Sequence, residues 1–574
     1  MEFPAGNFIF EGLCSIVASA PIMPPTKQVP TLFDTSLKQV MFHLIEICKM
    51  TEQVREPSQG NGIDQVSNYI HENLIASVKN CLLKKIMYQI LHSKFDGMLD
   101  IGLFRSTVNG HGVTVPLLGK IIKSILLIFS VEGTTELNFQ HDIIRQISAF
   151  ENVVGNHCKE AFIYTVYAKP LWAKSLVSLN FKYVADSNIM RVVAAHCPNL
   201  QYLNIESLHE PHDTDPLVDN LCWLYGEYSS PWPSANMPKG CPKLQTLILP
   251  KYKGLMPAVS HVLKMVVYMP DLCCVRNVDT RLVTEKYLEE FGDAQPLKLI
   301  ELEEWPRSCV DRSVKSDFTE TAKIVPSVKS YKSYSGELLT EDFYRLSNLA
   351  TSFMCLEHLV LYQDRFNNLE FDLKNLPCIP NIRSLELDLD EENIVLEQVH
   401  SLSKAFPNLK QLKIHSCGLF TYMNDAEKET GVLFDHLETL DFHRVTEMDT
   451  EFLGAFLKYC PKLISLSLSV SALFATDEDE PVTHELIYAL RDDMQNLEKI
   501  LIMREYEKYA DPLSLTLDDA IILMAVCPKL TWLGKLGTWC VTEREVEMLI
   551  AFCKSQNRDL HISYSQTDYS TNDL

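Results

Sequence analysis

The sequence has few of the residues and motifs on which catalytic and nucleotide-binding sites depend. Glycine occurs 21 times in 574 residues, which disfavours the glycine-rich loops that cradle phosphate groups. No phosphate-binding loop, G-x-S-x-G, H-E-x-x-H or protein-kinase motif occurs. We therefore expect a protein that is not an enzyme and that needs no cofactor.

Cysteine pairs of the CxxC type are also absent, although the sequence contains 17 cysteines. Their absence removes the zinc-finger and thioredoxin-like interpretations. Cysteines that are scattered and flanked by apolar residues are typical of reduced packing residues inside the cell. We expect no metal site and a cytoplasmic or nuclear location.

Positive charge is scarce, because 52 Lys and Arg face 75 Asp and Glu, a formal net charge of -23. Nucleic acid is therefore not an expected partner. The most apolar segment, residues 113–131, contains Lys120 and Lys123, and an ionised lysine near the centre of a membrane span costs about 2.5–3.5 kcal/mol. The N-terminus has no cation before its apolar stretch and carries Glu2, so neither a signal peptide nor a membrane partner is expected.

What the sequence does contain is a repeated apolar pattern, L-x-x-L-x-L. Its best copies are spaced 26, 27, 28 and 26 residues apart, inside the range of leucine-rich repeats, and begin at Leu356, Ile382, Leu409, Leu437 and Leu463. Further copies begin at Leu176, Leu200, Leu244, Leu497 and, in degraded form, Leu530, with weaker ones near Leu272 and Val328. The repeat is irregular, because the longer gaps hold insertions.

Each copy of the pattern predicts a short strand preceded by a helix. The alternation L-x-L places two apolar side chains on one face of a strand. Apolar residues at helical spacing predict a helix over residues 187–196, which ends at Cys197-Pro198. One helix and one strand cannot bury their apolar faces alone, so neighbouring units must stack into a continuous core.

A second motif, Cys-Pro-x-Leu, marks the junctions between helix and strand. It begins at Cys197, Cys241, Cys460 and Cys527, and variants begin at Met269 and Phe406. The motif resembles the cysteine-containing leucine-rich repeats of the ribonuclease-inhibitor-like superfamily, which also occur in F-box and elongin-box substrate receptors of ubiquitin ligases. The resemblance implies an α/β leucine-rich-repeat solenoid, curved and built of parallel strands and helices, that binds proteins.

The remaining segments differ from the repeats. We expect a flexible tail over residues 1–30, a helical N-terminal domain over 31–165, the irregular repeat array over 170–562 and a polar tail over 563–574. The helical domain would either bind an adaptor protein or cap the open apolar edge of the first repeat.

The outward positions of the strands supply a candidate binding surface on the concave face. Between the paired apolar residues stand Val360, Glu386, Lys413, Asp441 and Ser467, and the next row reads Tyr362, Asp388, His415, His443 and Ser469. The candidate partner-binding residues are Tyr362, Glu386, Asp388, Lys413, His415, Asp441 and His443. Three interpretations remain open: a solvated face whose charges satisfy one another, a recognition strip for a partner's Arg or Lys, and an incomplete metal or pH-sensing site at Asp388, His415 and His443.

The N-terminal region carries two weak adaptor patterns. Thr31, Leu32, Ser36 and Val40 fit the loose pattern of an elongin-binding box, and Leu37 belongs to a second register of it. Ile70-His71-Glu72-Asn73-Leu74 distantly resembles the start of an F-box. The resemblance thus implies a substrate receptor or adaptor of a cullin-type ubiquitin ligase, with elongin or an F-box adaptor and a cullin as partners and a protein substrate on the concave face. The alternative is a structural or signalling scaffold outside any ligase.

Overall fold

The chain forms two compact units in the computed structural model. Unit 1 comprises Met1–Tyr252 and Ser260–Leu272, and unit 2 comprises Lys253–Val259 and Cys273–Leu574. The structure describes residues 61–92, 115–139, 148–182, 184–206, 220–226, 240–250, 256–292, 295–305, 318–334, 344–362, 376–388, 393–415, 418–420, 434–446, 448, 450–458, 460–470, 487, 495–504, 512–556 and 558–564.

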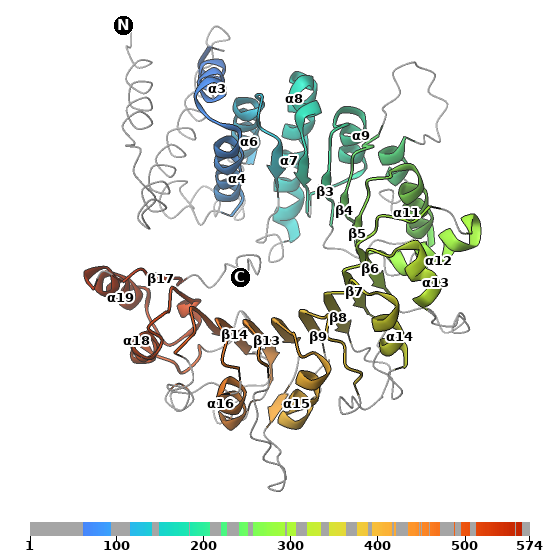
Figure 1. The fold of residues 1–574 in the computed structure, drawn as a ribbon. Coiled ribbons are helices and arrows are strands. Elements are labelled where there is room, and N and C mark those ends of the chain that lie inside the picture. Colours follow the sequence, from blue (N-terminus) through green and yellow to red (C-terminus); the bar gives the residue numbers. More distant parts are fainter. Residues whose placement is uncertain are drawn as a thin grey trace, which may run out of the picture. The chain divides into compact units, whose positions relative to one another are not determined.

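Unit 1 combines helices with a short parallel ladder (Figure 1). Its elements are α3 (Asn61–Asn73), α4 (Ala76–His92), α6 (Val115–Phe129), β1 (Glu136–Asn138), α7 (Ser148–Ala168), α8 (Pro170–Ser175), β2 (Ser178–Asn180), α9 (Ser187–His196), β3 (Tyr202–Asn204), the 3-10 helix η3 (Asn220–Tyr225) and β4 (Thr246–Ile248). Helix α11 (Met256–Tyr268) follows them. Helix α9 has the predicted bounds, and Asp186 caps it by accepting a hydrogen bond from the Ile189 N–H at 2.9 Å.

The parallel ladder of unit 1 begins earlier than the predicted array start at residue 170. Strand β1 pairs with β2 and places Leu137 beside Leu179. Leu137 and Phe139 are buried as in the other repeats, but buried Thr134 stands where the first leucine of the pattern is expected. The L-x-x-L-x-L pattern does not extend to this strand for that reason. The predicted segment 31–165 therefore contains a repeat-like strand besides its helices.

Most of the apolar segment at residues 113–131 forms a helix, α6, whose side chains are largely buried. Helix α6 buries Ile122, Ile125, Leu126 and Phe129, and it packs against α7 and α3. Among the described residues, no helix is long and apolar enough to cross a membrane.

Unit 2 is a curved array in which strands line the inner side and helices the outer side (Figure 1). Its elements are β5 (Cys274–Arg276), α12 (Thr280–Phe291), β6 (Glu301–Glu304), α13 (Phe318–Ile324), β7 (Ser330–Ser333), α14 (Tyr344–Ser352), β8 (His358–Tyr362), β9 (Ser384–Asp388), β10 (Asn393–Val395), α15 (Leu396–Ala405), β11 (Gln411–His415), β12 (Gly418–Phe420), β13 (Thr439–Val445), α16 (Thr450–Lys458), β14 (Ser465–Val470), β15 (Lys499–Arg504), α18 (Leu517–Val526), β16 (Trp532–Gly534), η6 (Leu536–Thr538), α19 (Glu543–Ser555) and β17 (His561–Ile562). Ten of the strands form one parallel sheet in the order β17-β16-β15-β14-β13-β11-β9-β8-β7-β6, and β10 pairs separately with β12.

The register of this sheet follows the repeat pattern. The middle leucines of successive repeats stand opposite one another and are buried; they are Leu359, Leu385, Leu412, Leu440 and Leu466. Strands also follow the weak repeats near Leu272 and Val328. This stacking of strand on strand and helix on helix confirms the predicted α/β leucine-rich-repeat fold.

The Cys-Pro-x-Leu motif forms the turn between helix and strand. The Cys197 N–H donates to the last turn of α9 at Val193 O (2.9 Å), and the Leu200 N–H donates back to Cys197 O (3.2 Å). The same return bond joins Leu463 to Cys460 and Leu530 to Cys527, each at 3.1 Å. Burial raises the pKa of the Cys460 and Cys527 thiols to about 12. These cysteines are buried free thiols, as the sequence predicts.

Candidate functional site

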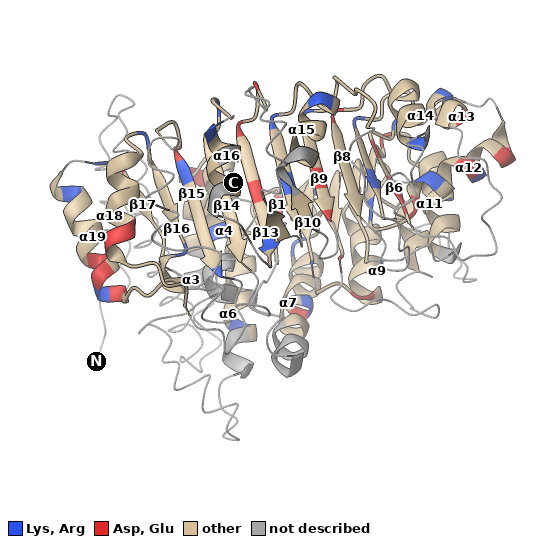
Figure 2. Ribbon diagram, turned by 90° about the horizontal axis from the view of Figure 1, so that it is seen from below, with Lys and Arg blue, Asp and Glu red and all other residues tan. Residues whose placement is uncertain are grey.

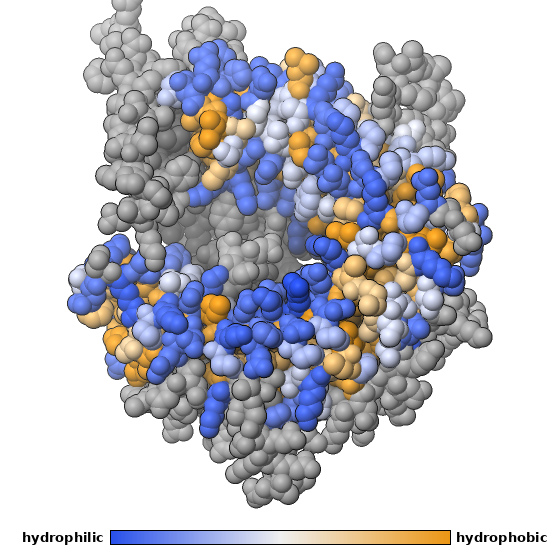
Figure 3. Space-filling model, viewed as in Figure 1, coloured by the Kyte–Doolittle hydropathy of each residue, from blue (hydrophilic) through white to orange (hydrophobic). Residues whose placement is uncertain are grey.

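The seven predicted partner-binding residues lie together on the inner side of unit 2. In one row, Tyr362, Asp388, His415 and His443 stand opposite one another on β8, β9, β11 and β13. In the adjacent row stand Val360, Glu386, Lys413 and Asp441. Acidic and basic positions alternate from strand to strand, from Glu386 to Lys413 to Asp441 (Figure 2), and hydrophilic side chains predominate on this side of the array (Figure 3). Each of the seven is half-buried.

Glu386 is the centre of this group. Its Oε1 accepts a hydrogen bond from the Tyr362 hydroxyl at 3.3 Å and lies 3.2 Å from His415 Nε2. Burial tends to raise the pKa of this carboxyl, but the bond with His415 and the charge of Lys413 outweigh it, so the pKa lies below its usual range. Glu386 is therefore bonded to side chains of the row that contains Tyr362 and His415, rather than to its neighbours in its own row.

The two histidines lie side by side at the far end of the row. Their ring centroids are 5.0 Å apart with the planes at 53°. Burial, His415 and Lys413 lower the pKa of His443 to about 3, so His443 is neutral at physiological pH. Within the described residues, no group of three or more His, Cys, Asp or Glu is placed to hold a metal ion. A bulge follows, because the register shifts between Phe442 and Val445 and Arg444 has φ of 61°.

At the other end, the row continues as a stack of aromatic rings. Trp305 and Tyr334 stack with centroids 4.1 Å apart, and Tyr334 and Tyr362 stack at 4.5 Å, with interplanar angles of 19° and 17°. Trp305 directly follows β6, and Tyr334 directly follows β7. We call Trp305, Tyr334 and Tyr362 the aromatic stack.

Acidic residues accompany the stack on β6. Glu301 Oε1 lies 2.5 Å from Lys332 Nζ, and its Oε2 accepts from Arg276 Nε at 2.9 Å. Glu303 Oε2 accepts from the Asn277 N–H at 2.7 Å. Burial, reinforced by the neighbouring Glu301, raises the pKa of Glu303 to about 7. Lys332 Nζ also lies 3.5 Å from Glu303 Oε1, so the stack stands beside two carboxylates that are paired with Lys332 and Arg276.

Sequence reasoning found Tyr362 but missed Trp305, Tyr334 and the acidic residues of β6. The repeat that contains β7 is predicted near Val328, and extending the row of Tyr362 and Asp388 by one strand to this repeat leads to Tyr334. The repeat of β6 was not recognised, because Leu299-x-x-Leu302 is followed by Glu304 instead of a third leucine.

Glu304 points to the core side of β6 and is held by a buried polar cluster. It is ion-paired with Arg281 and, at 2.7 Å, with Arg345, and it accepts a hydrogen bond from the Tyr331 hydroxyl at 2.8 Å. The Phe318 ring lies 4.6 Å from the Arg281 guanidinium. This cluster lies behind the surface that carries the aromatic stack and fixes β6 to α12 and α14.

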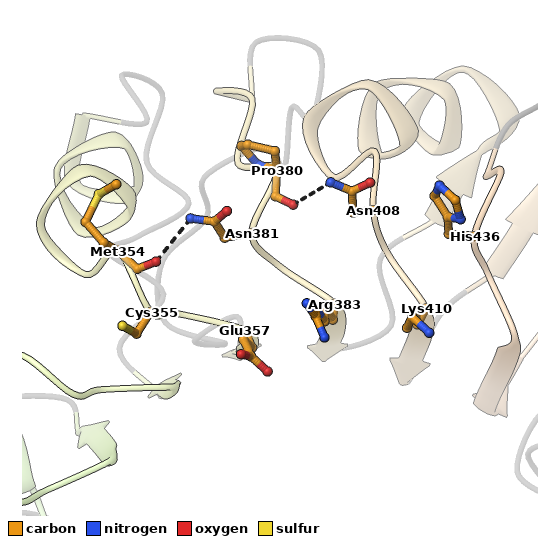
Figure 4. A pocket seen from close by; sticks show the side chains of 9 residues that line it. All are labelled: Met354, Cys355, Glu357, Pro380, Asn381, Arg383, Asn408, Lys410 and His436. Atoms are coloured by element: carbon orange, nitrogen blue, oxygen red, sulfur yellow. Dashed lines mark hydrogen bonds between the residues drawn. The ribbon is translucent and has the colours of Figure 1, made fainter.

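A groove of about 420 Å³ runs along the edge where the strands begin (Figure 4). Its lining consists of Met354, Cys355, Glu357, Pro380, Asn381, Arg383, Asn408, Lys410 and His436. Asn381 Nδ2 donates to Met354 O at 3.2 Å, and Asn408 Nδ2 donates to Pro380 O at 2.9 Å. Each bond joins a repeat to the preceding one. The groove therefore results from the spacing of the repeats, and its two asparagines join neighbouring repeats to one another.

The predicted adaptor-binding residues Thr31, Leu32, Ser36, Leu37 and Val40 lie outside the described residues. The F-box-like segment lies on α3 at the end of that helix, where Ile70 is buried within unit 1. In the insertion after β3, the Tyr225 ring stacks on Tyr268 at 6.0 Å, so this aromatic packs onto the array.

Comparisons with known proteins give no family. No family model matches the chain, and no curated protein matches it. Among solved structures, the leucine-rich-repeat-containing protein LegL7 from Legionella pneumophila is 14% identical to this chain, with a TM-score of 0.31. The match covers 64% of this chain and 94% of the LegL7 chain. A chain of the Rad7 and Elc1 complex in yeast is 13% identical, with a TM-score of 0.32. This match covers 73% of the present chain and 96% of that chain. The repeat architecture is established by the strand register of this chain itself.

Proposed function

We propose that this protein binds another protein through the inner side of unit 2. The observation that carries the proposal is the row from Tyr334 to His443, in which half-buried aromatic and charged side chains stand in register on the sheet, backed by the buried Trp305 at its end. Aromatic residues held in fixed positions lose little conformational entropy on binding, and they are enriched among the residues that dominate binding energies. A parallel sheet supports many such contacts at regular spacing.

A photo-crosslinking amino acid tests this proposal when it is placed at Lys413 on the inner side of β11. The matched control is the same amino acid at Lys404, on α15 of the same repeat. We expect crosslinked proteins, identified by mass spectrometry from native cells, from position 413 and not from 404. Equal crosslinking from both positions, or from neither, would contradict binding on the inner side.

We further propose that the protein is a substrate receptor or adaptor of a cullin-type ubiquitin ligase. What supports this role is the sequence pattern at Thr31, Leu32, Ser36, Leu37 and Val40, together with an array suited to holding a substrate. In this proposal the N-terminal segment binds elongin or an F-box adaptor, and unit 2 presents the substrate to the ligase. The alternative is a scaffold that brings proteins together without ubiquitin transfer.

Affinity purification separates these two roles. The intact chain is compared with a Leu32→Ala, Leu37→Ala double variant and with a Leu171→Ala control, since Leu171 is an exposed leucine in unit 1. The ligase role predicts that an adaptor and a cullin co-purify with the intact chain and the control but not with the double variant. Recovery of partners without any adaptor, with ligase activity trapped, would favour the scaffold.

A further inference from the structure

Asp441 is a carboxylate on the inner side of unit 2 that is not bonded within the fold. It stands in the row of Glu386 and Lys413, opposite Lys413 on β11 and opposite Ser467 on β14. Its side chain is half-buried, and its Oδ1 is buried without a hydrogen bond. No ion pair or hydrogen bond joins this carboxylate to any described residue. Because a half-buried charge without a partner is costly, a partner from outside the fold is expected.

Glu386, two strands away in the same row, is bonded in a different way. It accepts a hydrogen bond from the Tyr362 hydroxyl and lies 3.2 Å from His415 Nε2, so the chain itself satisfies this carboxylate. Asp441 is half-buried like Glu386 and lacks such contacts. Glu386 therefore contributes to the sheet, whereas Asp441 is open to a ligand.

Polar atoms without hydrogen bonds extend from Asp441 onto β14. The inner side of β14 carries Ser465, Ser467 and Ser469 in succession, and the hydroxyls of Ser465 and Ser469 are buried without a hydrogen bond. These side chains are short and uncharged. Lys413 lies on the other side of Asp441, so a cation above Ser467 stays about 9.6 Å, two strand spacings, from the row position of Lys413. A basic group therefore meets Asp441 with least repulsion from the β14 side.

We propose that Asp441 binds the ammonium group of a lysine side chain from the partner protein, which approaches from the β14 side. The inference rests on the proposed protein-binding function and specifies its chemistry. Because Oδ1 is buried, the ligand reaches the carboxylate from one oxygen, which disfavours the two parallel hydrogen bonds that a guanidinium forms. An ammonium is compact and donates from a single atom. The formal net charge of -23 attracts a basic partner before contact.

Stability measurements test whether Asp441 is free for a ligand. Asp441→Val introduces the residue type that Val360 provides in the same row on β8, and Glu386→Val on the neighbouring strand β9 is the matched control. Without a partner, we expect Asp441→Val to raise the urea midpoint, because it removes an unpaired half-buried charge and valine favours strands. Glu386→Val should lower the midpoint, because Tyr362 and His415 lose their bonds. Equal losses in both variants would mean that Asp441 serves the fold, which would overturn the proposal.

A tethered ammonium group tests the preference for a cation on the full chain. Thr439→Cys places a thiol two residues before Asp441 on the same face, about 6.6 Å away. Gln411→Cys places one at the equivalent distance before Lys413, on the neighbouring strand. Each variant is equilibrated with cystamine or with bis(2-hydroxyethyl) disulfide, and peptide mass spectrometry measures the mixed disulfide at each cysteine. Relative to the exposed Cys540 of the same chain, we expect position 439 to favour the amine at least threefold and position 411 not to favour it.

A second substitution shows whether the preference belongs to Asp441. Adding Asp441→Asn to Thr439→Cys should abolish it, whereas adding Asp518→Asn, at an exposed acid of α18, should leave it within twofold. Equal amine preference at positions 439, 411 and 540 would reveal general attraction to an acidic protein. A preference that survives Asp441→Asn would place the cation elsewhere, and either result would overturn the assignment.

Failure of this inference is distinguishable from failure of the proposed function. If crosslinking from position 413 captures a partner and Asp441→Asn leaves that capture unchanged, the Asp441 assignment is wrong and the binding function stands. If position 413 captures no partner, the binding function fails, and the tethering measurements still decide whether Asp441 receives an ammonium group.

Discussion

Glu304 occupies a position at which the repeat pattern places a leucine, and its surroundings show why a carboxylate is tolerated there. Arg281 and Arg345 both pair with it, and they outweigh the effect of burial, so that the pKa of Glu304 is lowered. Buried ion pairs contribute little net stability when intact, but removing one partner leaves an uncompensated charge in the core. The cluster therefore behaves as a unit.

Replacing one member of the cluster should cost far more than replacing all of them. Glu304→Leu restores the leucine pattern yet removes a partner from half-buried Arg345 and from buried Arg281, which keeps only its ion pair with Glu285 at 3.2 Å. We expect it to lower the free energy of unfolding by about 3–5 kcal/mol. Adding Arg281→Met and Arg345→Met should recover most of that loss. Urea unfolding measures the stability of both variants. Glu438→Gln is the surface control, and we expect it to change the free energy of unfolding by less than about 1 kcal/mol. Undiminished stability of Glu304→Leu alone would contradict this account.

Glu303 makes stability depend on pH in a defined direction. Its pKa is about 7 in the folded chain and 4.5 as its ordinary value, so the folded state binds the proton more tightly than the unfolded state. The contribution of this group is complete below pH 4.5 and is lost as the pH rises through 7, a difference of about 3 kcal/mol. Glu303→Gln should flatten the decline in stability between pH 5 and 8.

Thermal unfolding at a series of pH values measures the effect of Glu303→Gln. Glu320→Gln serves as control, because Glu320 is exposed in an ion pair with Lys323. Glu301 and Glu304 have lowered pKa values and contribute in the opposite sense, so each variant is compared with the parent at the same pH. Parallel pH profiles for parent and Glu303→Gln would refute the assignment.

At the scale of single elements, helix α19 shows how the outermost described repeat of the sheet is held. Thr542 and Glu545 form a capping box at the start of α19, in which Glu545 Oε2 accepts from the Thr542 N–H at 2.7 Å. Among the described strands, the one that follows, β17, pairs only with β16. A terminal repeat has a neighbour on one side, so its own cap matters more than that of an inner helix.

Removing this cap should loosen the terminal repeat selectively. Thr542→Ala is expected to cost about 1 kcal/mol and to speed amide hydrogen exchange in α19 and β17, with β8 to β13 unchanged. Exchange followed by mass spectrometry resolves these segments. Acceleration throughout the sheet would mean that the array opens as a whole rather than repeat by repeat.

The same scale shows how far the pattern could predict the fold. Strands β8, β9, β11, β13 and β14 were predictable, because each repeat kept leucines or their equivalents at all three buried positions. Strands β1 and β6 were not, because Thr134 and Glu304 replace one of the three. Local tertiary partners, such as the two arginines on Glu304, make those replacements possible, and no periodicity reveals partners from other helices.

The candidate surface was predictable only in part for a related reason. Register follows from the repeat, so the rows from Tyr362 to His443 and from Glu386 to Asp441 could be assigned from the sequence. The diagonal bonding of Glu386 and the stacking of Trp305 on Tyr334 depend on side-chain conformation, which spacing does not determine. Trp305 and Tyr334 were missed although they occupy the same row.

At the scale of the whole molecule, long-range attraction and local recognition should separate in kinetics. The formal charge of -23 accelerates the approach of a cationic partner, and salt screens it beyond about 8 Å at physiological ionic strength. A Glu386→Gln, Asp388→Asn variant removes two charges of this excess. Its association rate should therefore stay within about twofold of the parent, with the same salt dependence, because steering reflects the summed field.

Dissociation is where the double variant should differ. Loss of a charge-assisted contact acts on the dissociation rate of a bound complex, so a partner protein captured by crosslinking from position 413 should leave the variant at least tenfold faster at every salt concentration. Surface plasmon resonance between 50 and 500 mM salt measures both rates. A variant that slowed association and kept the parent dissociation rate would show that these carboxylates only add to the general field.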